Sequence, residues 1–339
     1  MRRVVRSLSI LALTLALSQP LLAGTLEDVK ARGTLRCGVN GGAPGLSLKD
    51  PAGHWSGMDV DFCRAVAAAT LGSKDKVAFV PLTVAAAPVA LAKGEVDLLA
   101  RNFSWNLERD VSAGISFVGI LLFDGQGFLV RRDTGLLSAL ELDDKRVCAL
   151  EGSTSADHVR RYFDRHRMDL DLRLFPDMGA AAKAYLADEC QVLTSDHLQL
   201  YGLRAGMEQG QDHRVLPEII SKEPLSPAVR EGDGRWFDLV RWTLFILIDA
   251  EELGIDSRNV QRAMSDAQAS DTRLLLDVEG QVAKNLGIDR DWVARVIGQV
   301  GNYGEIYARN LGDQSPLKVK RGFNALWNDG GLLYAPPPR

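Results

Sequence analysis

The alternation of strands and helices constrains the fold of this chain more than any other feature of its sequence. In the first third of the chain, the expected order is strand, helix, strand, helix, strand, at residues 34–39, 62–71, 77–82, 84–93 and 96–100. A second series with the same plan occupies residues 146–194, and the chain after residue 236 is mostly helical. Strands that alternate with helices usually pair in parallel, so the sequence predicts an α/β fold with helices layered on sheets.

The chain is long enough for about two domains. It has 339 residues, of which 46% are hydrophobic and 25% are charged. These values are ordinary for a globular protein and argue against intrinsic disorder or a coiled coil. The formal net charge is −4, and Lys and Arg are interspersed with Asp and Glu. Nucleic-acid-binding proteins usually carry a basic domain or stripe, so we expect no nucleic-acid partner.

The first 23 residues have the layout of a secretory signal peptide. Three arginines precede an apolar run at residues 8–17, and Pro20 and Ala23 follow it. The alternative is a membrane anchor, but a helix that spans a bilayer needs about 20 apolar residues and this run is about half as long. We therefore expect cleavage after Ala23 and export of residues 24–339. A second apolar stretch, at residues 242–248, favours a buried helix.

Four cysteines are spread through the chain, at Cys37, Cys63, Cys148 and Cys190. None of them belongs to a CxxC pair, which argues against a zinc ribbon or a thioredoxin-like redox site. An even number of cysteines in an exported protein favours disulfide bonds, and four cysteines allow three connectivities.

Four polar loops follow predicted strands, at residues 40–45, 102–109, 152–155 and 195–197. Open α/β sheets bind their ligands in loops at the carboxyl ends of strands. These loops contain the guanidinium of Arg109, the carboxylate of Asp196, several hydroxyls and glycine amides. A guanidinium binds a carboxylate through two parallel hydrogen bonds, and an aspartate accepts from an ammonium, so this set suits the head group of an amino acid. The alternative is a surface ion-pair network, because Arg109 lies between Glu108 and Asp110.

The sequence contains no recognisable catalytic motif. It has no P-loop, no GxSxG elbow, no HExxH and no GxGxxG. The five histidines show no metal-ligand spacing, and we expect His158 and His166, on a polar helical stretch, to be exposed. We therefore expect no catalytic residue, no metal and no cofactor.

Seven short stretches are distinctive in combination. They are VKARGTL at 29–35, GMDVD at 57–61, GEVD at 94–97, DGQGF at 124–128, LPEIISKEPL at 216–225, QVGNYGE at 299–305 and NALWNDGG at 324–331. Together they resemble the family-3 periplasmic solute-binding proteins of amino-acid ABC transporters, and they are most similar to the general L-amino-acid-binding type. The resemblance extends from about residue 25 to the end of the chain.

This resemblance implies a two-lobed periplasmic binding protein fold of type II, in which the lobes are joined by a hinge and the ligand lies in the cleft between them. We expect lobe 1 to comprise residues 24–130 and the mostly helical residues 224–339, and lobe 2 to comprise residues 131–223. The crossing strands would lie near residues 128–131 and 225–230.

The resemblance also implies roles for single residues. Arg109 falls where the family places the arginine that binds the ligand α-carboxylate, and Asp196 matches the acid that binds the α-amino group. The other positions that match ligand-binding residues are Asn102, Ser104, Gly152, Ser153 and Thr154. The chain departs from the family at Phe103 and Ser104, where relatives usually have two threonines.

The expected lobes favour one disulfide pairing. Cys37–Cys63 would lie within lobe 1 and Cys148–Cys190 within lobe 2, which leaves the hinge free. A bond between the lobes would oppose closure.

From these observations we expect a periplasmic, monomeric protein that captures L-amino acids and delivers them to an inner-membrane ABC permease. Specificity should be broad, because the loop at residues 40–43 has no aromatic or charged residue and residues 84–89 are small and apolar. Trp105 is the large aromatic that we expect near the cleft. One alternative is a periplasmic enzyme on the same fold, such as a cyclohexadienyl-type dehydratase. Another is an adaptor that senses a ligand for a receptor.

Overall fold

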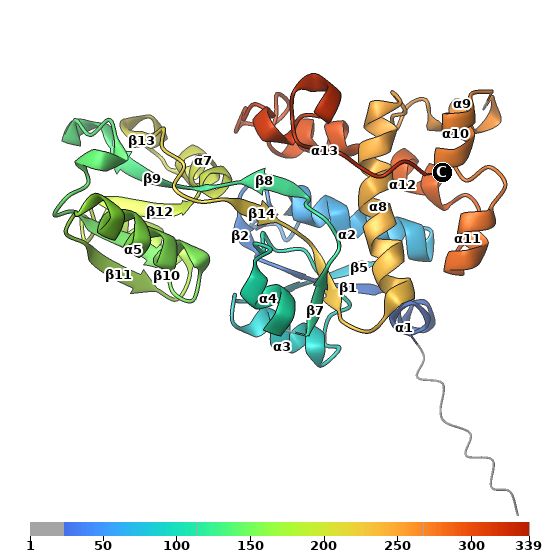
Figure 1. Ribbon diagram of the computed structural model, residues 1–339, viewed down its shortest axis with the longest axis horizontal. Helices are drawn as coiled ribbons and strands as arrows, with labels where there is room; N and C mark the ends of the chain where they lie inside the picture. Colours follow the sequence, from blue (N-terminus) through green and yellow to red (C-terminus); the bar gives the residue numbers. More distant parts are fainter. Residues whose placement is uncertain (1–23, 113, 267, 339) are drawn as a thin grey trace, which may run out of the picture.

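Two five-stranded sheets define two lobes; in Figure 1 one sheet lies at the left end of the molecule and the other near its middle, with the C-terminal helices beyond it. The computed structural model describes residues 24–338 except 113 and 267, so the expected signal peptide lies outside the described residues. The sheet of lobe 1 contains, in spatial order, β5 Val77–Pro81, β1 Leu35–Val39, β6 Leu98–Leu99, β15 Ala228–Arg230 and β7 Ile115–Phe117. The sheet of lobe 2 contains β11 Asp171–Phe175, β10 Arg146–Leu150, β12 Val192–Asp196, β9 Gln126–Arg131 and β13 His213–Val215.

Both sheets have the same plan. One strand of each lobe, β1 or β10, lies between two parallel neighbours, and antiparallel strands complete the sheet. The helices that connect the strands are α2 Met58–Leu71, α3 Ala86–Ala92 and α4 Leu107–Ser112 in lobe 1, and α5 Thr154–His166, α6 Met178–Leu186 and α7 His197–Gly206 in lobe 2. The α/β fold with two lobes that the sequence predicts is therefore confirmed.

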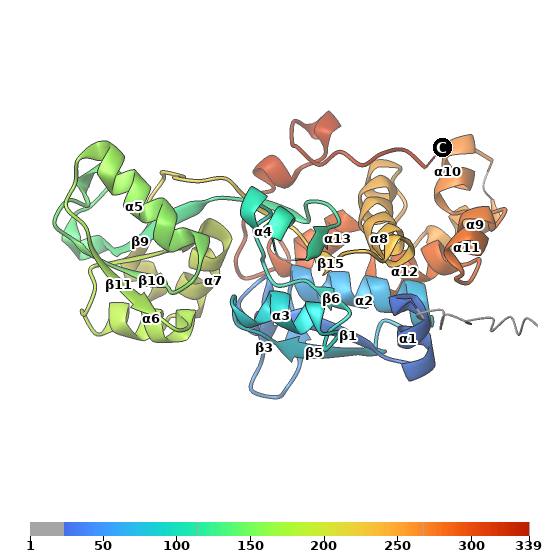
Figure 2. The same ribbon diagram turned by 60° about the horizontal axis from the view of Figure 1, so that its bottom comes forward.

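The sheet of lobe 2 is buried on both faces, as its nearly continuous apolar strands require. Because side chains alternate along a strand, Phe128 and Val130 of β9 point to one face and Leu129 points to the other. The first two pack with Val159 and Phe163 of α5, whereas Leu129 packs in a separate cluster with residues of α6. Figure 2 shows α5 and α6 on opposite sides of the strands.

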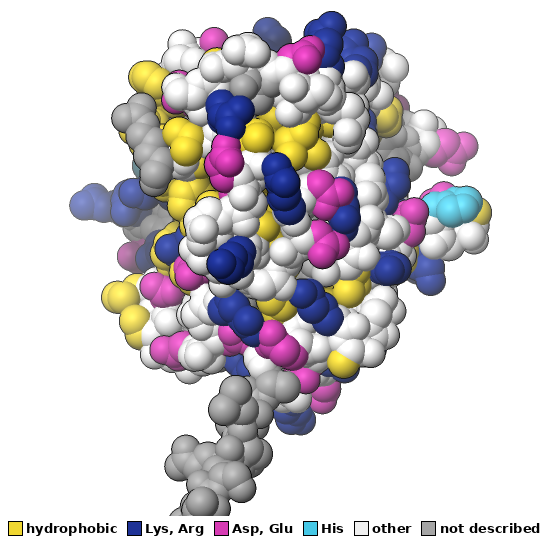
Figure 3. Space-filling model, turned by 90° about the vertical axis from the view of Figure 1, so that its right-hand side faces the viewer, with side chains coloured by type: hydrophobic (Ala, Val, Ile, Leu, Met, Phe, Trp, Pro, Cys, Tyr) yellow, Lys and Arg dark blue, Asp and Glu magenta, His cyan; other side chains and the backbone are white. Residues whose placement is uncertain are grey.

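The last third of the chain adds helices to lobe 1. In addition to α1 Thr25–Arg32, these are α8 Gly234–Glu252, α9 Val260–Ser265, α10 Ser270–Leu275, α11 Gln281–Leu286, α12 Trp292–Val300 and α13 Tyr303–Asn310. The apolar stretch at 242–248 lies in α8, where Leu244, Leu247 and their neighbours are buried in the main core. Across the described residues, we find no helix whose length and apolar character would let it cross a membrane. At this end of the molecule, basic and acidic side chains are intermixed on the surface (Figure 3).

Two short strands connect the lobes. β8 Leu122–Asp124 and β14 Glu223–Leu225 pair antiparallel, and β8 continues through Gly125 into β9 (Figure 1). The expected crossing near residues 128–131 is wrong for β9, because Gln126–Arg131 already pairs with β12 and β13 of lobe 2. The second expected crossing, near residues 225–230, covers the end of β14 and all of β15, and β15 belongs to the sheet of lobe 1. The apolar pattern identified strands there but could not identify their partners, so we propose lobe boundaries near residues 125 and 223.

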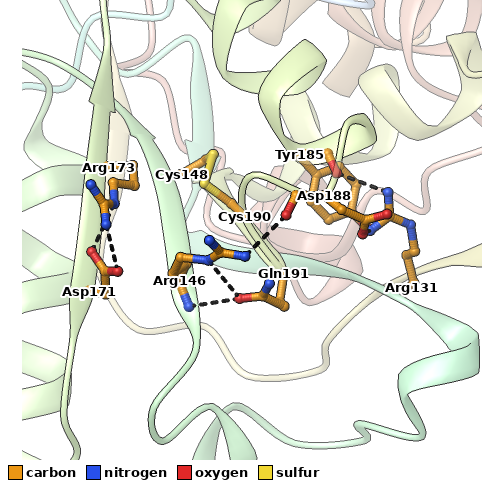
Figure 4. The surroundings of a disulfide bond; sticks show 9 residues. All are labelled: Arg131, Arg146, Cys148, Asp171, Arg173, Tyr185, Asp188, Cys190 and Gln191. Atoms are coloured by element: carbon orange, nitrogen blue, oxygen red, sulfur yellow. Dashed lines mark hydrogen bonds and ion pairs between the residues drawn. A yellow bond between two sulfur atoms is a disulfide. The ribbon is translucent and has the colours of Figure 1, made fainter.

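Each lobe contains one disulfide bond. Cys37 of β1 is bonded to Cys63 of α2, and Cys148 of β10 is bonded to Cys190, just before β12. Figure 4 shows the second bond beside Arg146, whose guanidinium donates to the Asp188 carbonyl oxygen at 3.2 Å. Both bonds lie within a lobe and leave the hinge strands unbridged, which is the pairing that the sequence argument favours.

Three further strands form a small antiparallel sheet on lobe 1. They are β2 Gly42–Ala43, β3 Ser47–Lys49 and β4 Trp55–Ser56. This sheet holds the loop after β1, which turns Asn40 toward the junction between the lobes.

Candidate ligand-binding cleft

A narrow cavity lies between the lobes, at the carboxyl ends of strands from both sheets. The residues that line it are Asn40, Val84, Arg101, Asn102, Phe103, Ser104 and Arg109 from lobe 1, and Leu150, Ser153, Thr154, Ser155, Ser195, Asp196 and Gln199 from lobe 2. Most of the residues that the sequence selected are therefore brought together. The reason is topological, since the loops that follow parallel strands emerge on the same edge of a sheet.

A buried carboxylate of α2 shapes the loop after β6. Asp59 accepts a hydrogen bond from the backbone N–H of Asn102 at 2.9 Å, and Asn102 has the left-handed φ of 48° that asparagine tolerates better than most residues. The side-chain oxygen of Asn102 accepts from Nδ2 of Asn40 at 2.9 Å. Burial raises the pKa of Asp59 to about 7, despite the Asn102 bond and the charge of Arg101. The loop is thus held by side chains from α2 and from the end of β1.

Arg109 lies on α4 with its guanidinium stacked on an aromatic ring. The guanidinium carbon is 4.0 Å from the centre of the Phe103 ring, and Nη1 donates to the Ser104 carbonyl oxygen at 2.9 Å. Burial lowers the pKa of Arg109, while the charges of Glu223 and Asp196 oppose that shift. Phe103, one of the two departures from the family pattern, therefore orients Arg109 and leaves its remaining donors available for a carboxylate.

Asp196 ends β12 on the opposite side of the cavity and is 6% exposed. Burial and repulsion from Glu223 raise its pKa to about 7, and a hydrogen bond from Asn102 and the charges of Arg109 and Arg101 act in the other direction. A buried carboxylate facing two guanidinium groups across the cleft can accept hydrogen bonds from an ammonium group whose own carboxylate is held by Arg109.

Glu223 is a buried residue that the sequence argument did not identify. It lies on β14 in the hinge, is 1% exposed, and accepts hydrogen bonds from the hydroxyls of Ser104 in lobe 1 and Thr154 in lobe 2. Ser221 Oγ donates to it at 2.7 Å, and Nδ1 of His158 lies 2.8 Å from its carboxylate. Burial alone would raise the pKa of Glu223, but the bonds from His158, Ser104 and Ser221 outweigh burial and hold the pKa below its ordinary value.

This network changes the chemistry expected of the two hydroxyls. The hydroxyls of Ser104 and Thr154 donate their hydrogen bonds to Glu223, so each hydroxyl oxygen can act toward a ligand only as an acceptor. They therefore suit a ligand ammonium better than a ligand carboxylate. The expectation that His158 is exposed is wrong, because its side chain is 20% exposed and is paired with Glu223 across the hinge.

The loop that precedes α5 contributes backbone groups. Ser153 turns its hydroxyl back to the Leu150 carbonyl at 2.7 Å and does not cap the helix. The first N–H groups of α5 are therefore not satisfied by that side chain, and such groups favour anions. Gly152, with a left-handed φ of 68°, does not line the narrow cavity but lines the larger one beside it.

Trp105 does not line the cleft. Its ring stacks on Phe117 with centroids 5.5 Å apart, and it lines a groove on the other side of the hinge. Its position in sequence, one residue after Ser104, suggested the cleft, but the backbone N–H of Trp105 donates to the Pro224 carbonyl and holds the residue against the hinge strand.

A second cavity, of about 520 Å³, opens beside the first. It is lined by Asn40, Pro81, Leu82, Thr83, Val84, Ala85 and Arg101 from lobe 1, and by Leu150, Glu151, Gly152, Pro176, Asp177 and Met178 from lobe 2. We call it the side chamber. Asn40, Val84, Arg101 and Leu150 line both cavities, so a ligand held at Arg109 and Asp196 has the side chamber next to it.

Comparison with known proteins places this geometry in context. The sequence profile of the bacterial extracellular solute-binding proteins, family 3, matches residues 35–309. The general L-amino acid-binding periplasmic protein AapJ of Rhizobium johnstonii is 45% identical over 318 residues, covering 94% of this chain and 93% of that protein. The glutamate/glutamine/aspartate/asparagine-binding protein BztA of Rhodobacter capsulatus is 42% identical over 317 residues, covering 94% of each. A periplasmic binding protein from Brucella ovis, solved with glutathione bound, is 45% identical with a TM-score of 0.91, and the match covers 94% of this chain and all of that one.

Proposed function

Since the chain belongs to the bacterial extracellular solute-binding proteins of family 3, we propose that it captures L-amino acids in the periplasm and delivers them to an inner-membrane ABC permease. The observation that carries this proposal is the pair Arg109 and Asp196, which come from different lobes and line the same narrow cavity. The proposal includes export by residues 1–23 and a monomeric state.

The head group of the ligand would bridge the two lobes. Its α-carboxylate binds the free donors of Arg109 on lobe 1, and its α-ammonium binds Asp196 on lobe 2, with the lone pairs of Ser104 and Thr154 beside it. Each charge of the zwitterion then meets an opposite charge in a site shielded from water, where such contacts are strong. A ligand that holds one residue of each lobe favours the closed arrangement over any arrangement in which the lobes separate.

We further propose that the protein carries out no chemical step. A dehydratase needs a positioned acid or base at the reacting atoms. Asp196, the buried acid that lines the cavity, would hold the ligand ammonium. Two further buried acids near the cavity are already committed: Glu223 to hydroxyls and His158, and Asp59 to the Asn102 backbone. Incubation of the protein with a cyclohexadienyl acid tests this directly, and turnover would contradict the proposal.

The experiment that tests the binding function is calorimetry of the protein, refolded from denaturant to remove bound ligand, against the full set of L-amino acids. Mass spectrometry of the small molecules released during denaturation identifies the ligand acquired in the cell. We expect amino-acid binding that Arg109→Ala weakens for every ligand. Absence of binding to any amino acid by the folded wild-type protein would refute the proposal.

A further inference from the structure

We propose that Arg101 holds a second carboxylate, on the side chain of the ligand, and so selects α-amino acids that carry one. The class comprises L-glutamate and L-aspartate, and also γ-glutamyl peptides, whose far end bears a carboxylate. This inference rests on the proposed function and adds the residue that determines which amino acids are preferred.

Arg101 is a buried cation without a partner. Arg101 lies two residues after β6 and is 4% exposed. Among the residues that the structure describes, none accepts a hydrogen bond from its Nε and no carboxylate forms an ion pair with it. Its one ring contact is with Phe103, at 5.8 Å. A guanidinium has five N–H donors and is rarely buried unless it is paired, so this arrangement predicts an anion supplied from outside the chain.

The charge of Arg101 persists despite its burial. Burial lowers its pKa to about 10, with attraction from Asp59 and Asp196 and repulsion from Arg109 as smaller effects, so the group is protonated at neutral pH. Asp59, the acid whose charge attracts Arg101 most strongly, accepts a hydrogen bond from the backbone of Asn102 and forms none with Arg101. The cation is therefore retained at a place where desolvation disfavours it.

The position of Arg101 fits a side-chain contact. Arg109 lines only the narrow cavity, whereas Arg101 lines both the narrow cavity and the side chamber. It thus lies where the side chain of a ligand leaves the head-group site. Gln199, which is 2% exposed, also lines the narrow cavity with a side-chain N–H group that lacks an acceptor in the described residues.

The charges of the cleft match a ligand with two carboxylates and one ammonium. Arg109 and Arg101 would each bind a carboxylate, and Asp196 would bind the ammonium, while Glu223 is already satisfied by His158 and three hydroxyls. A neutral amino acid would leave Arg101 buried and unpaired. The sequence argument for broad specificity rests on residues 40–43 and 84–89, which carry no charge, and this inference adds the charge of Arg101 to the same pocket.

The test compares three ligands by calorimetry: L-glutamate, glutathione and L-norvaline, an amino acid with a plain alkyl side chain. We expect the wild type to bind glutamate or glutathione at least 30-fold more tightly than norvaline. Arg101→Met should remove that preference while it changes the affinity for norvaline by less than threefold. Arg241→Met is the matched control, because Arg241 is also stacked on a phenylalanine in lobe 1 but lies outside both cavities. It should leave the ranking of ligands unchanged.

The two sources of the second carboxylate are separated by the same data. Preference for glutamate assigns a single amino acid, and preference for glutathione assigns a γ-glutamyl peptide that extends into the side chamber. Should Arg101→Met fail to fold, Arg101→Lys serves in its place. It keeps the charge but loses the two-pronged geometry, and it should weaken the favoured ligand at least tenfold with norvaline little affected.

Two results would overturn the inference. The first is equal affinity of the wild type for norvaline and for the dicarboxylic ligands. The second is an equal loss for all three ligands in the Arg101 variant, which would make Arg101 part of the head-group site. Neither result affects the proposed function, which fails only if the wild type binds no amino acid.

Discussion

Replacing Glu223 with glutamine removes the buried charge that both lobes share at the hinge and keeps the shape of the side chain. Glu223 accepts hydrogen bonds from Ser104, Thr154 and Ser221, and it is paired with His158. The amide of glutamine offers one acceptor oxygen and one NH₂ group, and the NH₂ group faces hydroxyls that donate. The variant should therefore lose stability at the junction of the lobes.

The size of the loss follows from these contacts. A hydrogen bond to a charged group contributes about 1.5–3 kcal/mol, and a buried polar group left without a partner costs about 1–3 kcal/mol. The His158 side chain is 20% exposed, so water partly compensates the histidine, and the hydroxyls can rotate toward the remaining oxygen. We expect the free energy of unfolding to fall by about 2–4 kcal/mol, which lowers the unfolding temperature by about 3–6 °C in a protein of this size.

The pH dependence of this loss has a definite sign. The pKa of Glu223 in the folded protein lies below its ordinary value of 4.5, which the unfolded chain restores. The ionised form is thus favoured by folding, so its contribution is fully present above pH 4.5 and is lost as the pH falls through the folded pKa. The difference in unfolding temperature between wild type and Glu223→Gln should be largest near pH 7 and should shrink below pH 4.5.

Thermal unfolding followed by circular dichroism at pH 7 and at pH 3.5 measures both effects. Glu208→Gln is the matched control, because it removes the same charge from an exposed position in lobe 2 and should leave the unfolding temperature within about 1 °C. If Glu223→Gln unfolds like the control at pH 7, the carboxylate does not stabilise the hinge and the reasoning is refuted. A difference that grows as the pH falls would refute the pH argument alone.

Three further predictions concern the head-group site and the disulfide of lobe 2. Arg109→Ala should weaken every L-amino acid at least tenfold without unfolding the protein, as measured by calorimetry and circular dichroism, and an unchanged Kd would show that the α-carboxylate binds elsewhere. The pKa of Asp196 is raised to about 7 and the ligand ammonium binds the ionised form, so the affinity for amino acids should fall as the pH is lowered from 8 to 5.5. Asp196→Asn should abolish that pH dependence. A wild-type affinity that does not change with pH would contradict this prediction. Cys148 and Cys190 are 42 residues apart, and replacing both with alanine should lower the free energy of unfolding, measured with denaturant, by about 3–4 kcal/mol. The order in which ligands are preferred should not change. A loss below about 1 kcal/mol would show that the bond constrains the unfolded chain little.

The parts of the fold that the sequence predicts are those set by local pattern. Strand and helix alternate in each lobe where apolar runs and Ala-rich stretches alternate. The observed β1 and β5 each differ from the expected range by about one residue at one end, and α2 begins about four residues earlier than expected. Arg109 and Asp196 each lie in a loop at the carboxyl end of a strand, where α/β sheets bind ligands, but they belong to different sheets. The strand pattern therefore places each residue at the edge of its own sheet, and the resemblance to a two-lobed family is what predicts that the two edges meet.

The parts that the sequence does not predict depend on which segments pair across long distances. Glu223 lies 119 residues from Ser104 and 69 from Thr154, and the three meet only because β14 pairs with β8 between the lobes. For the same reason the sequence pattern does not locate the hinge, because the apolar pattern of Gln126–Arg131 is compatible with pairing in either sheet.

Arg101 is a binding-site candidate that the sequence pattern itself indicates. A charged residue that directly follows a buried apolar strand cannot turn its side chain to solvent, because both faces of the strand are covered. Such a side chain must be paired or must face a binding site. Arg36, the second residue of β1, illustrates the paired case: its side chain donates to the Gly94 carbonyl and to Asp97. Arg101 has no such acceptors among the described residues, and that contrast between two arginines of lobe 1 is what distinguishes a structural cation from one that awaits a ligand.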